Sequence, residues 1–190
     1  MLAVLTLTLV LSTFAFNFNV TLPVLAKITL DGNAAVFGFL SALFGAGALV
    51  GALIAASREK ASGRVLLIGA GVFAFAELLL APITNVLLAG LLLFIVGVGF
   101  TAWSANSQAT LQLAAPDRLR GRIIGLYFFA FVGTGPLAGL FAGWLCAKGG
   151  TELAFAVAGG VGIVAVVATA LRLGWTPRYA PLRRRADVAA

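Results

Sequence analysis

Long uninterrupted stretches of apolar residues, separated by short polar breaks, dominate the chain up to about residue 172. A helix needs roughly 20 apolar residues to cross the hydrocarbon core of a bilayer, and these stretches meet or approach that length. The pattern therefore predicts an all-α membrane protein with six transmembrane helices. The predicted spans are approximately 2–26, 34–56, 65–82, 86–114, 120–147 and 152–172, and a basic cytoplasmic tail follows over 173–190.

Composition supports a membrane protein and argues against a soluble one. Of the 190 residues, 62% are hydrophobic and 10% are charged, and the mean hydropathy is +1.10. Soluble domains carry about 25% charged residues, and one of this size could not cover so much apolar surface. The net charge of +7 would suggest nucleic acid in a soluble protein. Here the basic residues lie between apolar stretches, so we expect lipid around the chain and no nucleic-acid partner.

The basic residues alternate between the two sides of the predicted membrane. The breaks after the second and fourth spans, together with the tail, contain most of the arginines, whereas the opposite side contains only Lys27 and Lys148. Loops rich in Lys and Arg stay in the cytoplasm. The distribution predicts a multi-pass protein of the cell membrane (plasma or inner) with both termini in the cytoplasm.

Small residues recur at four-residue spacing in two spans. The second span contains Gly47 and Gly51, and the fifth contains Gly135, Gly139 and Gly143. Such spacing lets helix backbones approach closely in lipid, so we expect these positions to pack against other helices. The alternative is that glycine is simply frequent in membrane helices.

The first span has a polar stripe. Thr13, Asn17 and Thr21 share one face of a helix, and Asn19 lies beside it. Polar side chains in hydrocarbon need partners, so this face should meet other helices or a wet cavity. Hydrogen bonds that only fix helix packing remain the equal alternative.

The fourth span has a denser polar stripe. Thr101, Ser104, Gln108 and Gln112 follow helical spacing, with Asn106 nearby. Amides facing lipid would be costly, which favours a water-accessible substrate pathway. The alternative is that part of this stripe lies at the cytoplasmic surface.

Glu77 is the acidic residue that falls clearly inside a span, and an intramembrane carboxylate is a candidate for proton coupling. It could instead lie close enough to the outer headgroups to reach water.

The charged breaks on the basic side suggest a cytoplasmic gate built from ion pairs, although a solvated basic loop explains them equally well. The gate candidates are Arg58, Arg64, Asp117, Arg120 and Arg122.

Other chemistries have little support in the residues. The chain has no histidine, which argues against an intramembrane serine protease, and one buried carboxylate is too few for an aspartyl dyad. We therefore expect a protein that is not an enzyme and that uses no metal or organic cofactor. A scaffold or assembly subunit held together by its glycine faces is the alternative to a transporter.

Several motifs together resemble the major facilitator superfamily, and within it most closely the drug and siderophore exporters, such as the enterobactin exporter and macrolide-efflux proteins. The motifs are Asn-Phe-Asn-Val at 17–20, Leu-Pro at 22–23, the glycine-rich 45–51, Pro-Asp-x-x-Arg-Gly-Arg at 116–122, and Gly135-Pro136-Leu137-x-Gly139. The match runs from about residue 2 to residue 171 and corresponds to the C-terminal six helices of the usual twelve.

The resemblance implies one half of a secondary transporter whose substrate binds between two six-helix halves. It implies proton-coupled efflux of a small compound, with spans one and four lining the cavity. It also places spans three and six at the periphery, which counts against Glu77 as a central proton carrier. The amide and hydroxyl groups suggest a neutral or amphipathic substrate. Because the chain begins almost directly in a span, we expect it to need a separate N-terminal half and not to transport alone.

Overall fold

The computed structural model describes residues 2–57 and 62–172, and every regular element in this part is helical. Five helical segments in the described residues are long and apolar enough to cross a membrane. The chain is therefore a multi-pass membrane protein. The five segments are Leu2–Thr29, Ala34–Ala56, Gly63–Leu80, Val86–Ala114 and Asp117–Arg172.

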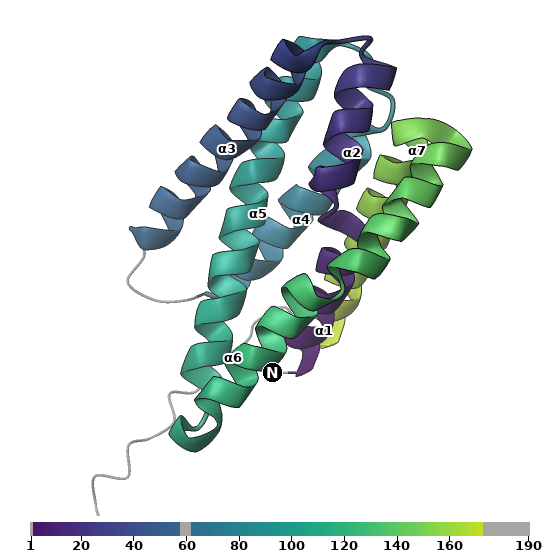
Figure 1. Cartoon of the computed structure of the whole chain (residues 1–190). Helices are drawn as coiled ribbons and strands as arrows, with labels where there is room; N and C mark the ends of the chain where they lie inside the picture. Colours follow the sequence, from purple (N-terminus) through teal and green to yellow (C-terminus); the bar gives the residue numbers. More distant parts are fainter. Residues whose placement is uncertain (1, 58–61, 173–190) are drawn as a thin grey trace, which may run out of the picture.

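The number of segments differs from the six spans that the sequence predicts, because the fifth and sixth predicted spans fall within Asp117–Arg172. A straight helix of that length would extend roughly 80 Å, far beyond a hydrocarbon core of about 30 Å. The chain instead reverses direction within α7 (Gly135–Arg172), as Figure 1 shows. The backbone leaves helical geometry at Gly149 and Gly150, and Gly150 has a φ of 65°, which a residue without a Cβ adopts easily.

The first segment is broken near its middle. It consists of α1 (Leu2–Val10), a π turn η1 (Leu11–Ala15), α2 (Phe18–Val24) and a second π turn η2 (Leu25–Thr29). The backbone of Phe16 and Asn17 between η1 and α2 is not helical. The reversal divides α7 into a first arm (135–148) and a second arm (151–172). The first segment crosses the centre of the bundle, between these two arms and the other helices (Figure 1).

The middle of the chain forms three long helices, α3 (Ala34–Ala56), α4 (Gly63–Leu80) and α5 (Val86–Ala114). Two of them begin at asparagine caps. The Asn33 side chain accepts hydrogen bonds from the first free N–H groups of α3, and the Asn85 side chain does the same for α5. Such caps satisfy backbone donors that have no partner within the helix.

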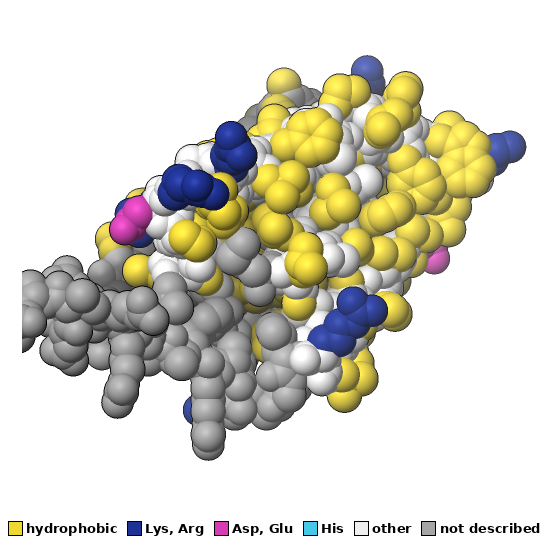
Figure 2. Space-filling model, turned by 90° about the horizontal axis from the view of Figure 1, so that it is seen from below, with side chains coloured by type: hydrophobic (Ala, Val, Ile, Leu, Met, Phe, Trp, Pro, Cys, Tyr) yellow, Lys and Arg dark blue, Asp and Glu magenta, His cyan; other side chains and the backbone are white. Residues whose placement is uncertain are grey.

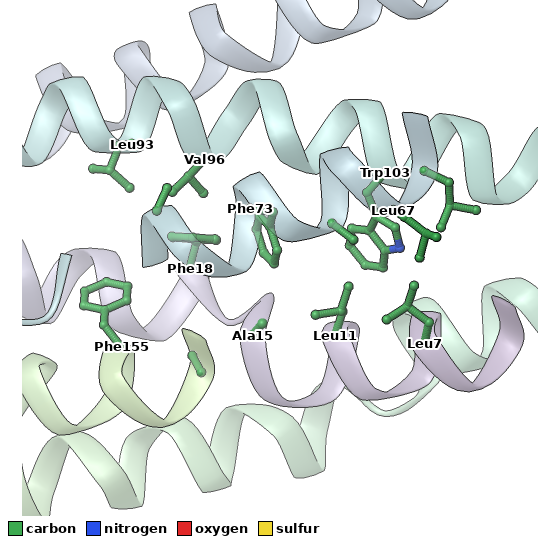
Figure 3. Close-up of a cluster of buried hydrophobic side chains, with 14 of the residues drawn as sticks. Leu7, Leu11, Ala15, Phe18, Leu67, Phe73, Leu93, Val96, Trp103 and Phe155 are labelled. Atoms are coloured by element: carbon green, nitrogen blue, oxygen red, sulfur yellow. The ribbon is translucent and has the colours of Figure 1, made fainter. Parts of the chain in front are cut away.

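The chain then passes through a short 3-10 turn η3 (Asp117–Leu119), α6 (Arg120–Phe128) and a π turn η4 (Phe129–Gly133) before it enters α7. The core lies where α1, α2, α4, α5 and the second arm of α7 meet. Figure 3 shows Trp103 and Phe73 facing Leu11 and Phe18 across this core, with Phe155 from α7 closing it.

The described Lys and Arg side chains lie at the margins of the molecule. Figure 2 shows the Lys and Arg side chains in separate groups around a surface that is mostly hydrophobic. Large apolar side chains point outward, among them Leu87 on α5 and Leu140 on α7, which is 73% exposed. Such a surface is suited to lipid and not to water.

Candidate functional site

Two π turns face each other near the middle of the bundle and are joined by hydroxyl groups. The Ser12 hydroxyl of η1 donates to the Ala130 carbonyl of η4 at 2.6 Å. One residue further, the Thr13 hydroxyl donates to the Thr134 hydroxyl at 3.0 Å. π turns occur frequently at functional sites because they free backbone groups from the regular helical pattern. Thr13 from the predicted stripe therefore joins the first segment to the start of α7.

Asn17 occupies the break in the first segment. Its side chain is buried, and its amide donates to the Thr13 carbonyl at 2.9 Å. The Thr21 hydroxyl donates in turn to the Asn17 carbonyl at 3.1 Å. The Asn17 amide thus satisfies the Thr13 carbonyl beside the break, whereas the Asn17 carbonyl also accepts from the backbone N–H groups of Val20 and Thr21. Asn19, by contrast, is exposed and takes no part in this network.

A pocket of about 270 Å³ lies between α5 and α6. Ser104 and Gln108 from the predicted polar stripe form its wall on α5. Tyr127 forms part of the opposite wall, and its hydroxyl donates to the Ser104 carbonyl at 3.2 Å. This hydrogen bond ties the two helices together at the pocket.

Aromatic rings make up most of the remaining wall. Phe100, Phe128 and Phe131 line the pocket with Tyr127. Phe131 stacks on Tyr127 with ring centroids 5.7 Å apart, and Phe100 stacks on Phe16 at the helix break at 4.4 Å. The wall of the pocket is therefore in contact, through Phe100, with the break in the first segment. It offers an amide, hydroxyl groups and flat apolar faces, and its lining includes no acidic or basic side chain.

The structure places the other residues of the α5 stripe away from this pocket. Asn106 is buried and faces α4, where its side-chain oxygen accepts from the Ser62 backbone N–H at 3.1 Å. Thr101 lies against α3 beside Gly51, and Gln112 is half-buried one turn beyond Gln108. Of the predicted cavity residues, only Ser104 and Gln108 line the described pocket.

The aromatic residues of the pocket were not among those predicted from the sequence. One signal was present, because Phe100, Ser104 and Gln108 stand at i, i+4 and i+8 and so share one helix face. Tyr127 and Phe131 are also four residues apart. Nothing in the sequence tells that these two faces meet across the bundle.

Glu77 lies inside the protein and does not reach the surface. It is 1% exposed, and neither carboxylate oxygen has a hydrogen-bond partner among the described residues. Phe73 and Leu80, one turn to either side on α4, are also fully buried. The expectation that Glu77 could reach the outer headgroups is therefore not supported by its surroundings. A buried polar group without partners is costly, which makes this position unusual.

The predicted gate residues that the structure describes are exposed at one end of the bundle. Asp117 and Arg120 form an ion pair at 2.8 Å, whereas Arg64 and Arg122 are exposed and form no ion pair with a described residue. Arg58 lies outside the described residues. The structure brings together one pair of the five predicted gate residues.

The family model for the Major Facilitator Superfamily matches residues 4–188. No curated protein and no solved structure matches the chain.

Proposed function

The chain belongs to the Major Facilitator Superfamily, a family of membrane transporters, and on this premise we propose that it forms one half of a secondary transporter that exports a small amphipathic compound. Family membership agrees with a protein that is not an enzyme. We further propose that the chain lies among the drug and siderophore exporters, and the Gly135-Pro136-Leu137-x-Gly139 motif of α7 supports this placement.

The pocket between α5 and α6 is the observation that carries the proposal. In transporters of this kind, substrate sites lie near the membrane midplane and are formed by discontinuous helices. The pocket meets these criteria in part, because its aromatic wall is in contact with the broken first segment through Phe16 and Phe100. Ser104 and Gln108 supply polar groups on an otherwise aromatic surface.

The chemistry of the pocket favours an uncharged, flat substrate. Stacked rings attract planar apolar groups, and a side-chain amide can both donate and accept hydrogen bonds. An anionic or cationic substrate would find no opposite charge among the lining residues. We therefore propose a neutral amphipathic compound that contains an aromatic ring.

Binding to the purified chain in lipid nanodiscs tests this pocket. A panel of neutral, cationic and anionic aromatic dyes should give binding of the neutral members, and Gln108→Leu should weaken it by about tenfold because it removes the amide. Gln112→Leu is the matched comparison, since Gln112 lies on the same stripe but does not line the pocket. An equal loss in both variants, or a preference for charged dyes, would contradict the proposal.

A complete transporter would require a second six-helix half. We propose a separate or upstream N-terminal half as the partner, since the motifs of the sequence resemble those of the C-terminal half of such transporters. Proteoliposomes that contain the chain alone should not move substrate, and those that contain both halves should. Transport by the 190-residue chain alone would contradict this part of the proposal.

Proton coupling through Glu77 is a second part of the proposal. Its complete burial, without a hydrogen-bond partner among the described residues, favours a carboxyl group that takes up and releases a proton during transport. Glu77→Gln in the complete transporter should abolish efflux driven by a proton gradient but retain substrate binding. Unchanged gradient-driven efflux would exclude Glu77 as the coupling residue.

The basic ends of the helices support a topology with both termini in the cytoplasm of a cell membrane. Cys146 is the single cysteine, so Cys146→Ala followed by a new cysteine at Arg118 or at Thr84 allows labelling from one side. A membrane-impermeant thiol reagent applied outside cells should label the cysteine at Thr84 and not the one at Arg118. The reverse labelling pattern would overturn this topology.

A scaffold that does not transport is the competing function. The glycine repeat on the first arm of α7 favours it, because the repeat leaves open space at Gly135 for another membrane helix. Such a scaffold would bind a partner but would show neither dye binding nor gradient-driven efflux.

A further inference from the structure

A second cavity, of about 470 Å³, forms a groove between α1 and the C-terminal part of α7. It shares no lining residue with the pocket at Ser104. Ala3 and Val10 mark its extent on α1, and Gly160 and Arg172 mark its extent on α7. Small side chains leave it open, and a Cβ added at Gly160 would meet no atom within 4 Å.

The length of the groove along α7 is close to the thickness of one membrane leaflet. Residues 160 to 172 of α7 extend roughly 18 Å at the rise of an α-helix. One leaflet accounts for about half of a hydrocarbon core of about 30 Å. The groove therefore reaches from the headgroup level at Arg172 to near the midplane.

The lining is suited to hydrocarbon and not to water or a polar ligand. Apart from Arg172, the polar groups are the hydroxyls of Thr6 and Thr169. The Thr6 hydroxyl is already used, because it donates to the Leu2 carbonyl at 3.0 Å. Water in such a groove would lack the polar partners that hold buried water.

The open end of the groove is basic. Arg172 is exposed in the last turn of α7 and forms no ion pair with a described residue. The exposed Arg118 and Arg122 lie at the same end of the bundle, where Asp117 is already paired with Arg120. A guanidinium group binds phosphate through two parallel hydrogen bonds, and a cluster of basic residues at the membrane surface attracts anionic headgroups.

We propose that this groove is a binding site for an anionic phospholipid from the leaflet at the basic end of the bundle. One acyl chain lies between α1 and α7, and the phosphate binds Arg172. This site depends on the membrane location of the chain and not on the proposed transport function. A bound lipid would fill the space that separates the two helices and hold them at a fixed distance.

Photo-crosslinking of the full chain in nanodiscs tests the proposal. The nanodiscs consist of phosphatidylcholine and a small amount of a lipid with a photoreactive acyl chain. This photoreactive lipid is phosphatidylglycerol in one sample and phosphatidylcholine in the other. Labelled peptides are identified by mass spectrometry. Acyl labelling should concentrate on residues 3–10 and 160–172. Phosphatidylglycerol should label more strongly than phosphatidylcholine, and excess inorganic phosphate should not abolish the labelling.

Two pairs of variants separate the acyl chain from the headgroup. Ala168→Phe fills the groove and should remove the labelling, whereas Val167→Phe, on the exposed surface of the same helix, should not. Arg172→Gln should lower the preference for phosphatidylglycerol by about fivefold, and Lys148→Gln, which alters an exposed basic side chain outside the groove lining, should leave it nearly unchanged. Arg172→Gln alters an exposed side chain, so it stays informative even if Ala168→Phe does not fold.

Three results would overturn the proposal. The first is that phosphatidylglycerol and phosphatidylcholine label the unaltered chain equally, and label the Arg172→Gln variant equally as well. The second is labelling spread evenly over the exposed helices. The third is protection of Arg172 by inorganic phosphate without acyl labelling, which would identify a phosphate site that takes no lipid.

Discussion

Two glycine repeats with the same four-residue spacing lie in very different surroundings. In α3, a Cβ added at Gly47 would overlap the carbonyl oxygen of Phe94 on α5. One added at Gly51 would lie 2.7 Å from the carbonyl oxygen of Val98. The two helices therefore touch through their backbones at this point, and no larger residue fits.

In the first arm of α7, the repeat is loosely packed. A Cβ at Gly135 would have no atom within 4 Å, and those at Gly139 and Gly143 would have only ordinary contact with Val20. The neighbouring Leu140 is largely exposed. This glycine face is open at Gly135 and lies beside α2 at Gly139 and Gly143, with room there for a Cβ.

The difference shows what small-residue spacing can and cannot establish. Spacing of four residues places the glycines on one helix face, and close approach becomes possible there. Whether another backbone lies against that face depends on the path of the whole chain. Four substitutions test this contrast, ordered from the largest expected effect to the smallest.

Gly47→Leu should cause the largest loss of stability, about 3 kcal/mol or more, because backbone atoms of α5 cannot move aside for the new side chain. Gly45→Leu is the matched control, since Gly45 lies on the same helix and a Cβ there would meet no atom within 4 Å. Thermal unfolding in detergent measures both variants. Similar melting temperatures would mean that α3 and α5 do not touch as described.

Asn106→Leu extends the contrast from glycines to polar residues. It removes the acceptor for the Ser62 N–H at the start of α4, so we expect a loss of about 1–3 kcal/mol. Gln112→Leu, on the same polar stripe, should cost less because its side chain makes no hydrogen bond to a described residue. Unfolding by SDS in mixed micelles compares the two, and a larger loss from Gln112→Leu would reverse their assigned roles.

Gly139→Ala should act in the opposite direction to any substitution at Gly47. Alanine fits at this position, and it favours a helix over glycine by roughly 0.5–1 kcal/mol. The isolated chain should therefore become slightly more stable. If the proposed partner half packs on this face, the same substitution should weaken the complex, which co-purification of the two halves would measure.

Asp117→Asn should have the smallest effect. The ion pair with Arg120 is exposed to solvent, and pairs of this kind contribute about 0.3 kcal/mol. The difference from the unaltered chain should vanish at high salt, because salt screens exposed charges. A loss that persists at high salt would indicate that the pair is buried in the working protein.

Part of the candidate site was predictable from residues alone. The polar stripes identified Ser104 and Gln108, since helical spacing places them on one face. The aromatic wall was not predictable, because Tyr127 and Phe131 lie on a separate helix whose contact with α5 depends on the turns at 115–119. Helix geometry turns Asn106 and Gln108 toward different neighbours, but the sequence does not tell which helices those neighbours belong to.

The sequence by itself determined that the chain spans a membrane through apolar helices, because an apolar run of that length has no other stable location. It also placed most of the basic residues at one end, since the breaks after the second and fourth spans carry arginines whereas the break after the third carries no charge. Only the tertiary structure decided that the first predicted span is broken at Phe16 and Asn17. The tertiary structure also decided which glycine face is tightly packed. Contact between helices depends on distant parts of the chain, and the spacing of residues within one helix does not reveal which parts those are.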